Sequence, residues 1–295
     1  MTMTPGEDRI PDRLVVSIED RRATVIDIIR NAKRHIALSL FRCNDAAVFA
    51  ELAAATARGV AVDVLTTSRA KGGRKKLAQL KASLDETGAT VKMYTDPVVK
   101  YHAKYLVADD GPALVASLNF TKKCFRTTCD AIVVTYDPAV VSSLQRLMAA
   151  DSARERMPDD LSDRLLVGPE RARRQFTALI AQARSSIRLI DAKLSDPDLV
   201  SLLNAKRAGG LTVEVFSAKR LGEAKSHGKI MLVDDATVMV GSLALAALSL
   251  DFRREVAIVV TEPTAVASAV ELFNTVRGAA ESRAASAGAA GEVPC

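Results

Sequence analysis

The chain carries the same arrangement of five polar residues twice, and this repeat strongly limits what it can fold into. Each copy begins at a histidine and continues with a lysine at +2, an aspartate at +7, a serine at +15 and a carboxylate at +28. The first copy comprises His102, Lys104, Asp109, Ser117 and Asp130, and the second comprises His227, Lys229, Asp234, Ser242 and Glu255. The two copies lie 125 residues apart. Five residues matched at four offsets indicate an internal duplication, so we expect two similar halves.

The segments around the two copies also follow one order. Apolar periodicity predicts a helix, a strand, a helix and a strand at 22–33, 34–40, 46–58 and 60–65, and again at 170–183, 186–190, 196–208 and 211–216. Strands that alternate with helices indicate the α/β class. Only the first half has a further basic helix and a strand at 89–94 before its histidine.

These patterns predict a domain organisation. We expect an N-terminal half at 1–157, a C-terminal half at 158–278, and a tail at 279–295 that is a frayed helix or disordered, because it is rich in Ala, Ser and Gly. His35 lies outside the repeated pattern, and its equivalent in the second half is expected to be Ile187. A structural role is predicted for it.

Composition limits the class of protein further. Apolar residues make up 48% of the 295 residues, and no run reaches the roughly 18 apolar residues that span a bilayer. The first residues lack the apolar core of a secretory signal. The four cysteines show no paired metal-binding spacing. We therefore expect a cytoplasmic protein with reduced thiols, without a transmembrane segment, a metal or another cofactor.

The repeated residues suit chemistry on a phosphate group. His102 and Lys104 lie two apart at the start of a predicted strand, so their side chains leave the same face, and His227 and Lys229 do the same. A carboxylate that returns to each imidazole would hold Nδ1–H and leave Nε2 free. One imidazole can then attack phosphorus while the other, protonated, gives its proton to the leaving oxygen. The lysines would stabilise charge on the non-bridging oxygens.

This arrangement resembles the phospholipase D superfamily, whose hallmark is H-x-K-x(4)-D followed by G-S-x-N. Both histidine segments match the first part of the hallmark, and the resemblance covers roughly residues 20–275. The second part is Ala116-Ser117-Leu118-Asn119 in the first copy and Gly241-Ser242-Leu243-Ala244 in the second. The resemblance implies two α/β/α sandwich repeats related by a pseudo-twofold axis, with one active site at their interface. It also implies a metal-free reaction through a covalent phosphohistidine.

The resemblance assigns roles to individual residues. The catalytic set it implies is His102, His227, Lys104, Lys229, Asp130 and Glu255. Within it His102 is the nucleophile, His227 the general acid, and Asp130 and Glu255 orient His102 and His227 respectively. The substrate phosphate would be bound by the lysines together with Asn119, Ser117 and Ser242. The motif aspartates, Asp109 and Asp234, are expected to be structural.

Three departures from the family pattern leave a degenerate phosphate-binding scaffold as an alternative. Ala244 replaces an expected asparagine. Thr128 and Arg253 stand where the family often has asparagine, two residues before each late carboxylate. Asp130 is shorter than the commoner glutamate.

The substrate remains open between two kinds of phosphodiester. Two motifs in one chain, and a Ser249-Leu250 segment similar to that of the cardiolipin synthase branch, favour a phospholipid and peripheral contact with an anionic membrane. The absence of tryptophan argues against a lipid interface. Residues 1–150 hold 22 Lys and Arg against 16 Asp and Glu, with a dense basic stretch from Arg69 to Lys76, which suits a metal-independent nuclease or nucleic-acid end-processing enzyme. We rank phospholipid hydrolysis or headgroup transfer first, nucleic acid second and the scaffold third.

Overall fold

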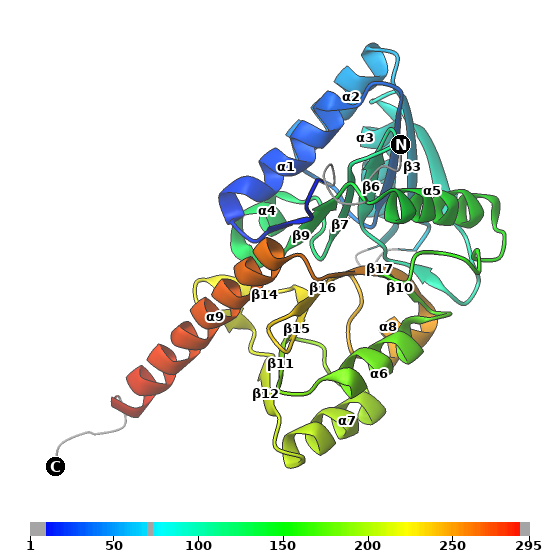
Figure 1. Cartoon of the computed structure of the whole chain (residues 1–295). Helices are drawn as coiled ribbons and strands as arrows, with labels where there is room; N and C mark the ends of the chain where they lie inside the picture. Colours follow the sequence, from blue (N-terminus) through cyan, green and yellow to red (C-terminus); the bar gives the residue numbers. More distant parts are fainter. Residues whose placement is uncertain (1–9, 70–72, 290–295) are drawn as a thin grey trace, which may run out of the picture.

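Two sheets with the same strand order form the framework of the protein. The computed structural model describes residues 10–69 and 73–289, and Figure 1 shows the two halves one above the other. The first sheet has the order β1-β9-β7-β6-β2-β3-β4, and the second has the order β10-β17-β16-β15-β11-β12. The second order repeats the first strand for strand, except that β4 has no equivalent.

The strands of the first half are β1 (Arg13–Val15), β2 (His35–Leu40), β3 (Ala61–Thr67), β4 (Thr90–Tyr94), β5 (Lys100–Tyr101), β6 (Tyr105–Ala108), β7 (Ala113–Ala116), β8 (Thr128–Cys129) and β9 (Ile132–Thr135). Those of the second half are β10 (Leu165–Gly168), β11 (Ser186–Asp191), β12 (Thr212–Phe216), β13 (Arg220–Leu221), β14 (Ala224–Ser226), β15 (Lys229–Val233), β16 (Thr237–Gly241) and β17 (Arg253–Val260). In the sheets, β2, β3 and β4 are parallel to one another, while β6, β7 and β9 are antiparallel to their neighbours.

Helices cover both faces of each sheet. They are α1 (Ile18–Asn31), α2 (Ala46–Ala57), α3 (Gly73–Asp85), α4 (Lys122–Thr127) and α5 (Pro138–Ala153) in the first half, and α6 (Ala172–Gln182), α7 (Pro197–Ala208), α8 (Ala247–Phe252) and α9 (Pro263–Ala289) in the second. In Figure 1, α1 with α2 and α6 with α7 lie at opposite ends of the molecule, whereas α9 begins between the two halves and runs outward towards the C-terminus. The predicted α/β fold and its two repeats are confirmed.

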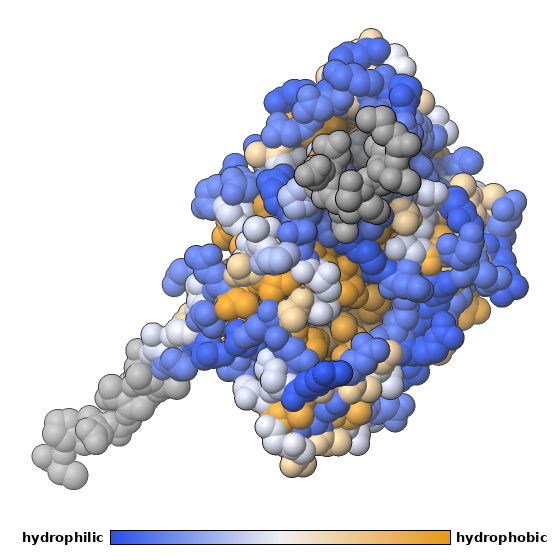
Figure 2. Space-filling view, viewed as in Figure 1, coloured by the Kyte–Doolittle hydropathy of each residue, from blue (hydrophilic) through white to orange (hydrophobic). Residues whose placement is uncertain are grey.

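Three apolar cores follow from this layering. One lies under the outer helices of the first half and includes Val25 and Leu52, and one lies under those of the second half and includes Phe176 and Leu203. The third is shared, because it joins residues such as Val133 of β9 to residues such as Ile258 of β17. Figure 2 shows mostly hydrophilic residues over the outer helices, with apolar residues gathered between the two halves. The halves are therefore joined by a common core.

The motif aspartates hold equivalent turns. Asp109 accepts hydrogen bonds from the backbone N–H groups of Lys33, Arg34 and His35, which lead into β2. Asp234 accepts them in the same way from residues 184–186, which lead into β11. Both aspartates adopt a left-handed backbone, with φ of 52° and 54°. The prediction that these two residues are structural is confirmed.

The predicted equivalent of His35 differs from the structure. The hydrogen bonds to Asp109 and Asp234, together with strand register, align Ile36 with Ile187, so His35 corresponds to Ser186 and not to Ile187. His35 Nε2 lies 2.9 Å from the carboxylate of Asp63 on the neighbouring strand β3. The tail predicted from residue 279 continues α9 as far as Ala289, since its sequence is rich in alanine.

Two short parallel pairings join the halves beside the shared core. β5 pairs with β17, so that Lys100 lies opposite Arg253 and Tyr101 opposite Arg254. β14 pairs with β8, so that Ser226 lies opposite Cys129. The backbone N–H of His102 donates to the carbonyl of Arg254 at 2.9 Å, and that of Gly228 donates to Cys129 at 2.8 Å. Each strand that leads to a motif histidine thus pairs with a strand that leads to the late carboxylate of the other half.

The second of these pairings generates a stability prediction. A Cβ added to Gly228 would lie 2.6 Å from the carbonyl oxygen of Cys129, so the backbones of β14 and β8 would have to separate. We expect Gly228→Ala to lower the free energy of unfolding by about 1–3 kcal/mol, as overpacking usually does, in a denaturant titration. Gly278→Ala is the control, because nothing lies within 4 Å of its added Cβ. Equal stability of the two variants would contradict the close packing of this pairing.

Candidate active site

The parallel pairings bring each motif histidine against the carboxylate of the opposite half. His102 Nδ1 lies 2.9 Å from Glu255 Oε1, and His227 Nδ1 lies 3.0 Å from both carboxylate oxygens of Asp130. Our prediction that Asp130 orients His102 and Glu255 orients His227 is therefore wrong. The reason is strand register, because the residue after β5 faces the third residue of β17, and the residue after β14 faces the residue after β8. The two histidine–carboxylate pairs are formed between the repeats.

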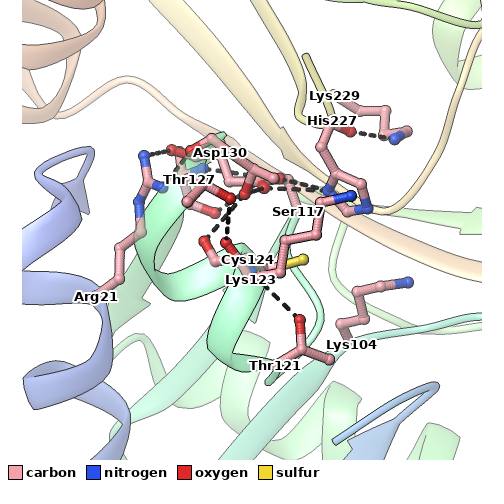
Figure 3. Close-up of polar contacts among 12 residues, drawn as sticks. Arg21, Lys104, Ser117, Thr121, Lys123, Cys124, Thr127, Asp130, His227 and Lys229 are labelled. Carbon is pink, nitrogen blue, oxygen red and sulfur yellow. Dashed lines mark hydrogen bonds and ion pairs between the residues drawn. The ribbon is translucent and has the colours of Figure 1, made fainter. Parts of the chain in front are cut away.

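Asp130 is held as an ionised carboxylate in a buried network. Ser117 Oγ donates to its Oδ1 at 2.6 Å, and Thr128 Oγ1 donates to its Oδ2 at 2.5 Å. Burial alone would raise the pKa of Asp130, but the charge of His227 and the hydrogen bonds from His227, Ser117 and Thr128 lower it. Figure 3 shows His227 and Arg21 reaching the Asp130 region from opposite sides. Arg21 is buried and donates to the backbone carbonyls of Thr128 and Asp130, at 2.6 and 2.5 Å.

Glu255 has a different environment. Ser249 Oγ donates to its Oε2 at 2.8 Å, and Arg253 lies 3.5 Å from its Oε1. Burial raises the pKa of Glu255, although the charge of Lys104 and the hydrogen bond from Ser249 oppose this shift. Burial, together with the charges of Lys104 and Arg253, lowers the pKa of His102 well below its usual range. The imidazole of His102 is therefore neutral near pH 7.

The motif lysines are buried, and each donates a hydrogen bond to the backbone carbonyl of its own histidine. Lys104 is 2% exposed, and its Nζ donates to the carbonyl of His102 at 2.6 Å. The same Nζ lies 3.2 and 3.3 Å from the two ring nitrogens of His102. Burial lowers the pKa of Lys104 to about 7, while the charge of Glu255 opposes the shift. Lys229 Nζ likewise donates to the carbonyl of His227.

The two histidines open into one pocket of about 830 Å³. Its lining contains both motif histidines, Asn119 and six cationic residues, namely Arg42, Arg69, Arg74, Lys100, Lys193 and Arg253. No carboxylate lines this pocket among residues 10–69 and 73–289. Oδ1 of Asn119 is buried without a hydrogen-bond partner. A pocket of this charge is suited to an anionic group that would lie between the two imidazoles.

Part of the predicted basic stretch takes part in this pocket. Arg69 and Arg74 line it, and the guanidinium of Arg69 also donates to the backbone carbonyls of Pro97 and Val99. Lys71, which belongs to the same stretch, lies outside the described residues. α3 thus supplies one wall of the pocket, and the second half has no counterpart to it.

The two motif serines do not lie where we predicted. Ser117 and Ser242 were expected to contact the substrate phosphate, but both are 1% exposed and neither lines the pocket. Ser117 is engaged by Asp130 and by the N–H of Ala131 at 3.0 Å, and Ser242 by the N–H of Val256 at 3.1 Å. Both hydroxyls instead hydrogen-bond to the backbone of the residue that follows the late carboxylate. Their position at the end of a buried strand explains this difference.

Several residues of the site had not been predicted from the sequence. Lys193 and Arg42 line the pocket from the ends of β11 and β2, at equivalent places in the two halves. The ring of Phe41 lies 4.5 Å from that of His102, centroid to centroid, and 5.4 Å from Lys104 Nζ. Lys193 is one residue in a chain with 41 Lys and Arg. Only its place after a repeated strand could have marked it.

One group of metal-ligand atoms occurs at the site. Among the described residues, Cys124, Asp130 and His227 are the only three whose ligand-type atoms lie within 4.8 Å of one another. Both oxygens of Asp130 and Nδ1 of His227 already hydrogen-bond within the network described above. These atoms are therefore committed to orienting the imidazole. No helix in the part of the chain that the structure describes is both long and apolar enough to cross a bilayer.

Two sheets of matching strand order, joined so that each half supplies a motif histidine to the lining of one basic pocket and a buried motif lysine next to that histidine, define a two-repeat phospholipase D-like fold. The model of the family described as "Cardiolipin synthase, PLD-like domain" matches residues 25–152 and 216–277, which is more than half of the chain. The chain belongs to this family of the phospholipase D superfamily.

Individual relatives resemble the chain at lower similarity. Cardiolipin synthase A of Pseudomonas entomophila is 28% identical over 141 residues, which are 47% of this chain and 29% of that protein. The chain thus spans less than a third of the length of the curated relatives it matches. A polyphosphate kinase from Porphyromonas gingivalis has a TM-score of 0.72 at 19% identity, over 89% of this chain and 46% of that one. A phosphatidylserine synthase from Haemophilus influenzae has a TM-score of 0.67 at 13% identity, over 90% of this chain and 86% of that one. These two structures share the fold.

The pKa of Lys104 generates a prediction about stability and pH. Its folded value of about 7 lies below its ordinary value of 10.5. Between these values the unfolded chain binds a proton that the folded chain does not, so this residue makes the protein more stable as pH rises from 7 to 10. The contribution is at most about 1.4 kcal/mol per pH unit for one proton. We expect the difference in unfolding free energy between wild type and Lys104→Met to move in favour of wild type over this range, in urea titrations at several pH values.

Comparison with the variant removes the contributions of thiols and tyrosines that titrate in the same range. Lys33→Met, which removes an exposed lysine, serves as the control and should show no such trend. A difference between wild type and Lys104→Met that stays constant with pH would show that Lys104 keeps its proton in the folded protein.

Proposed function

We propose that this protein is a phospholipase D-type phosphodiesterase that hydrolyses phospholipids or transfers their headgroups through a covalent phosphohistidine. The observation that carries the proposal is the pair of histidine–carboxylate contacts facing one cationic pocket. Two imidazoles held by different carboxylates can divide the roles of nucleophile and acid. The family model and the cardiolipin synthases of Pseudomonas support a phospholipid as the substrate.

His102 is the proposed nucleophile. Its lowered pKa keeps it neutral, and the contact of Nδ1 with Glu255 leaves Nε2 for attack. The Nε2 lone pair forms a bond to phosphorus while the bond from phosphorus to the leaving oxygen breaks. Lys104, Lys229 and Asn119 bind the non-bridging oxygens, where negative charge increases.

His227 is the proposed general acid and base. The contact of Nδ1 with Asp130 orients the ring so that the protonated imidazole can donate its other proton, from Nε2, to the leaving oxygen. The neutral His227 then takes a proton from water or from an alcohol. That oxygen attacks phosphorus, and the bond between His102 and phosphorus breaks. Water gives hydrolysis, and an alcohol gives headgroup transfer.

A second cavity supports a lipid substrate. It has a volume of about 650 Å³ and shares Phe41, Arg42 and Leu77 with the cationic pocket. Phe49 of α2 and Leu80 of α3 extend its apolar lining. We name this cavity the α2–α3 groove. An acyl chain attached to a phosphate in the cationic pocket could lie in this groove, which would shield it from water.

Exposed apolar residues near the pocket support peripheral membrane contact. Leu248 and Phe252 lie one turn apart on α8 and are 64% and 46% exposed. Phe252 precedes Arg253, which lines the pocket beside Lys100. Val98, at 61% exposure, stands two residues before Lys100. Apolar side chains that adjoin cationic ones fit the boundary of an anionic bilayer, and they lessen the argument drawn from the absence of tryptophan.

A nuclease or nucleic-acid end-processing activity is the second candidate. The observation that favours it is the set of six cationic residues in the pocket lining, which is more than one phosphate requires. A catalytically inactive phosphate-binding scaffold is the third, and it is motivated by Ala244.

The covalent intermediate gives the first test of this proposal. The protein should be incubated with a ³²P-labelled phosphodiester in EDTA. Label that is lost from the protein in acid and retained in alkali should reveal a phosphohistidine. His102→Ala should carry no label. His227→Ala should retain label for longer when the leaving group is a good one such as p-nitrophenol. The reason is that water, which hydrolyses the phosphohistidine, is no longer activated by His227 as a base. Label that persists in His102→Ala would move the nucleophile to His227, and complete loss of activity in EDTA would contradict the metal-free reaction.

The substrate class gives the second test. Purified protein should be offered anionic liposomes and, in parallel, labelled single- and double-stranded DNA. We expect cleavage of lipid, with Leu77→Ser raising KM for long-chain lipids by about tenfold and leaving KM for a short-chain soluble analogue unchanged. Leu202→Ser is the matched control, since Leu202 is a half-buried leucine on α7 outside the α2–α3 groove. Cleavage of DNA alone would reverse the ranking, and cleavage of neither would favour the scaffold.

A further inference from the structure

The second half-site lacks a side-chain donor where the first half-site has one. Asn119 lines the pocket in the first half, but Ala244 stands at its equivalent and is 2% exposed. The backbone N–H of Ala244 cannot replace an amide side chain, because it donates to Ser249 Oγ at 2.9 Å. The phosphate contact expected from this position is therefore missing in the second half.

A buried aspartate ties a lysine to this position. Asp191 is 0% exposed and ends β11. Its Oδ2 accepts the N–H of Leu245 at 2.7 Å, and its Oδ1 accepts the N–H of Lys193 at 2.8 Å. The carbonyl of Leu245 in turn accepts the N–H groups of Ser195 and Asp196, at 2.9 and 3.0 Å. The segment that carries Lys193 is thus fastened to the residue that follows Ala244.

The equivalent segment of the first half is joined by backbone groups, since the N–H of Phe120 donates to the carbonyl of Arg42 at 3.1 Å and the N–H of Asn44 donates to that of Phe120 at 3.2 Å. Only the second half adds a buried carboxylate to this connection. Strand register places Leu40 of β2 at the position equivalent to Asp191, and a leucine side chain accepts no hydrogen bond. The half that keeps Asn119 therefore has no carboxylate at this place, whereas the half that has Ala244 does. The two differences between the halves occur together in one small region.

The side chain of Lys193 reaches the pocket that both histidines line. Burial lowers the pKa of Lys193, and the neighbouring charges of Lys229 and Arg253 lower it further. Cations crowded in this way repel one another until an anion enters the pocket. The charges of Glu255 and Asp191 oppose this shift of the Lys193 pKa, but they do not cancel it.

We propose that Lys193 binds a non-bridging oxygen of the substrate phosphate in place of the amide that is missing at Ala244, and that Asp191 is the residue that positions it. The inference rests on the proposed function, because it assigns a phosphate-binding residue to the same site. It explains how a chain that departs from the family pattern at position 244 still surrounds one phosphate from both halves.

Binding of inorganic phosphate tests this inference without requiring turnover. We expect isothermal titration calorimetry to show at least tenfold weaker phosphate binding for Lys193→Met than for wild type, and retention of most of the affinity in Lys193→Arg. Lys33→Met is the control for the loss of one positive charge and should bind as wild type does. Equal weakening by Lys33→Met and Lys193→Met, or no weakening by Lys193→Met, would overturn the proposal.

Rescue by the family residue gives a sharper test. Lys193→Met should lower kcat/KM on the order of 100-fold, as loss of one donor to a developing anion does. Adding Ala244→Asn to this variant should raise its kcat/KM at least tenfold, whereas Ala244→Asn in the wild type should alter kcat/KM little. Failure of rescue in a double variant that melts as the wild type does would contradict the proposed substitution of one donor for the other.

The two measurements separate this inference from the proposed function. A protein that cleaves no phosphodiester but loses phosphate binding in Lys193→Met keeps the inference and loses the enzymatic proposal. A protein that forms the phosphohistidine and is indifferent to Lys193→Met keeps the enzymatic proposal and loses the inference. If Ala244→Asn fails to fold, the calorimetric comparison of Lys193→Met with Lys193→Arg decides.

Discussion

The parallel pairing of β5 with β17 and of β14 with β8 is the constraint on which the site depends. Each pairing involves only a few residues, yet each joins one repeat to the other. Because neighbouring residues on a strand point to opposite faces, a slip of one residue would turn each histidine away from its carboxylate. Gly228 is needed at one of these contacts, since a side chain there would meet the backbone of β8. Register between the halves thus decides which groups can act on one substrate.

The two half-sites share a plan but differ in their electrostatics. Asp130 receives two hydroxyl hydrogen bonds in addition to His227, and its pKa is lowered. Glu255 receives one such bond, from Ser249, and burial raises its pKa. The cations around His102 help to lower its pKa, whereas His227 hydrogen-bonds to an ionised carboxylate. Duplication followed by such changes can give two copies of one motif complementary roles.

The sequence predicted the positions of helices and strands better than the contacts of individual side chains. The helix and strand expected at 46–58 and 60–65 occur as α2 and β3 within two residues, because their periodicity and the glycine between them are local signals. The structural role of Asp109 and Asp234 was also predicted. The roles of Ser117 and Ser242 were not, because a motif position does not show which way a buried hydroxyl points. Lys193 was missed because its importance comes from a hydrogen bond between Asp191 and the segment after Ala244.

The sequence by itself determined that the chain is a duplicated α/β protein and that two histidines and two lysines recur at matched spacing. These properties are carried by the order of residues along each half. Tertiary structure alone decided that Glu255 serves His102 and Asp130 serves His227, and that Lys193 lies beside the place of the missing asparagine. The physical reason is that these contacts depend on hydrogen-bond register between segments that are distant in the sequence, and the spacing within either repeat carries no record of that register.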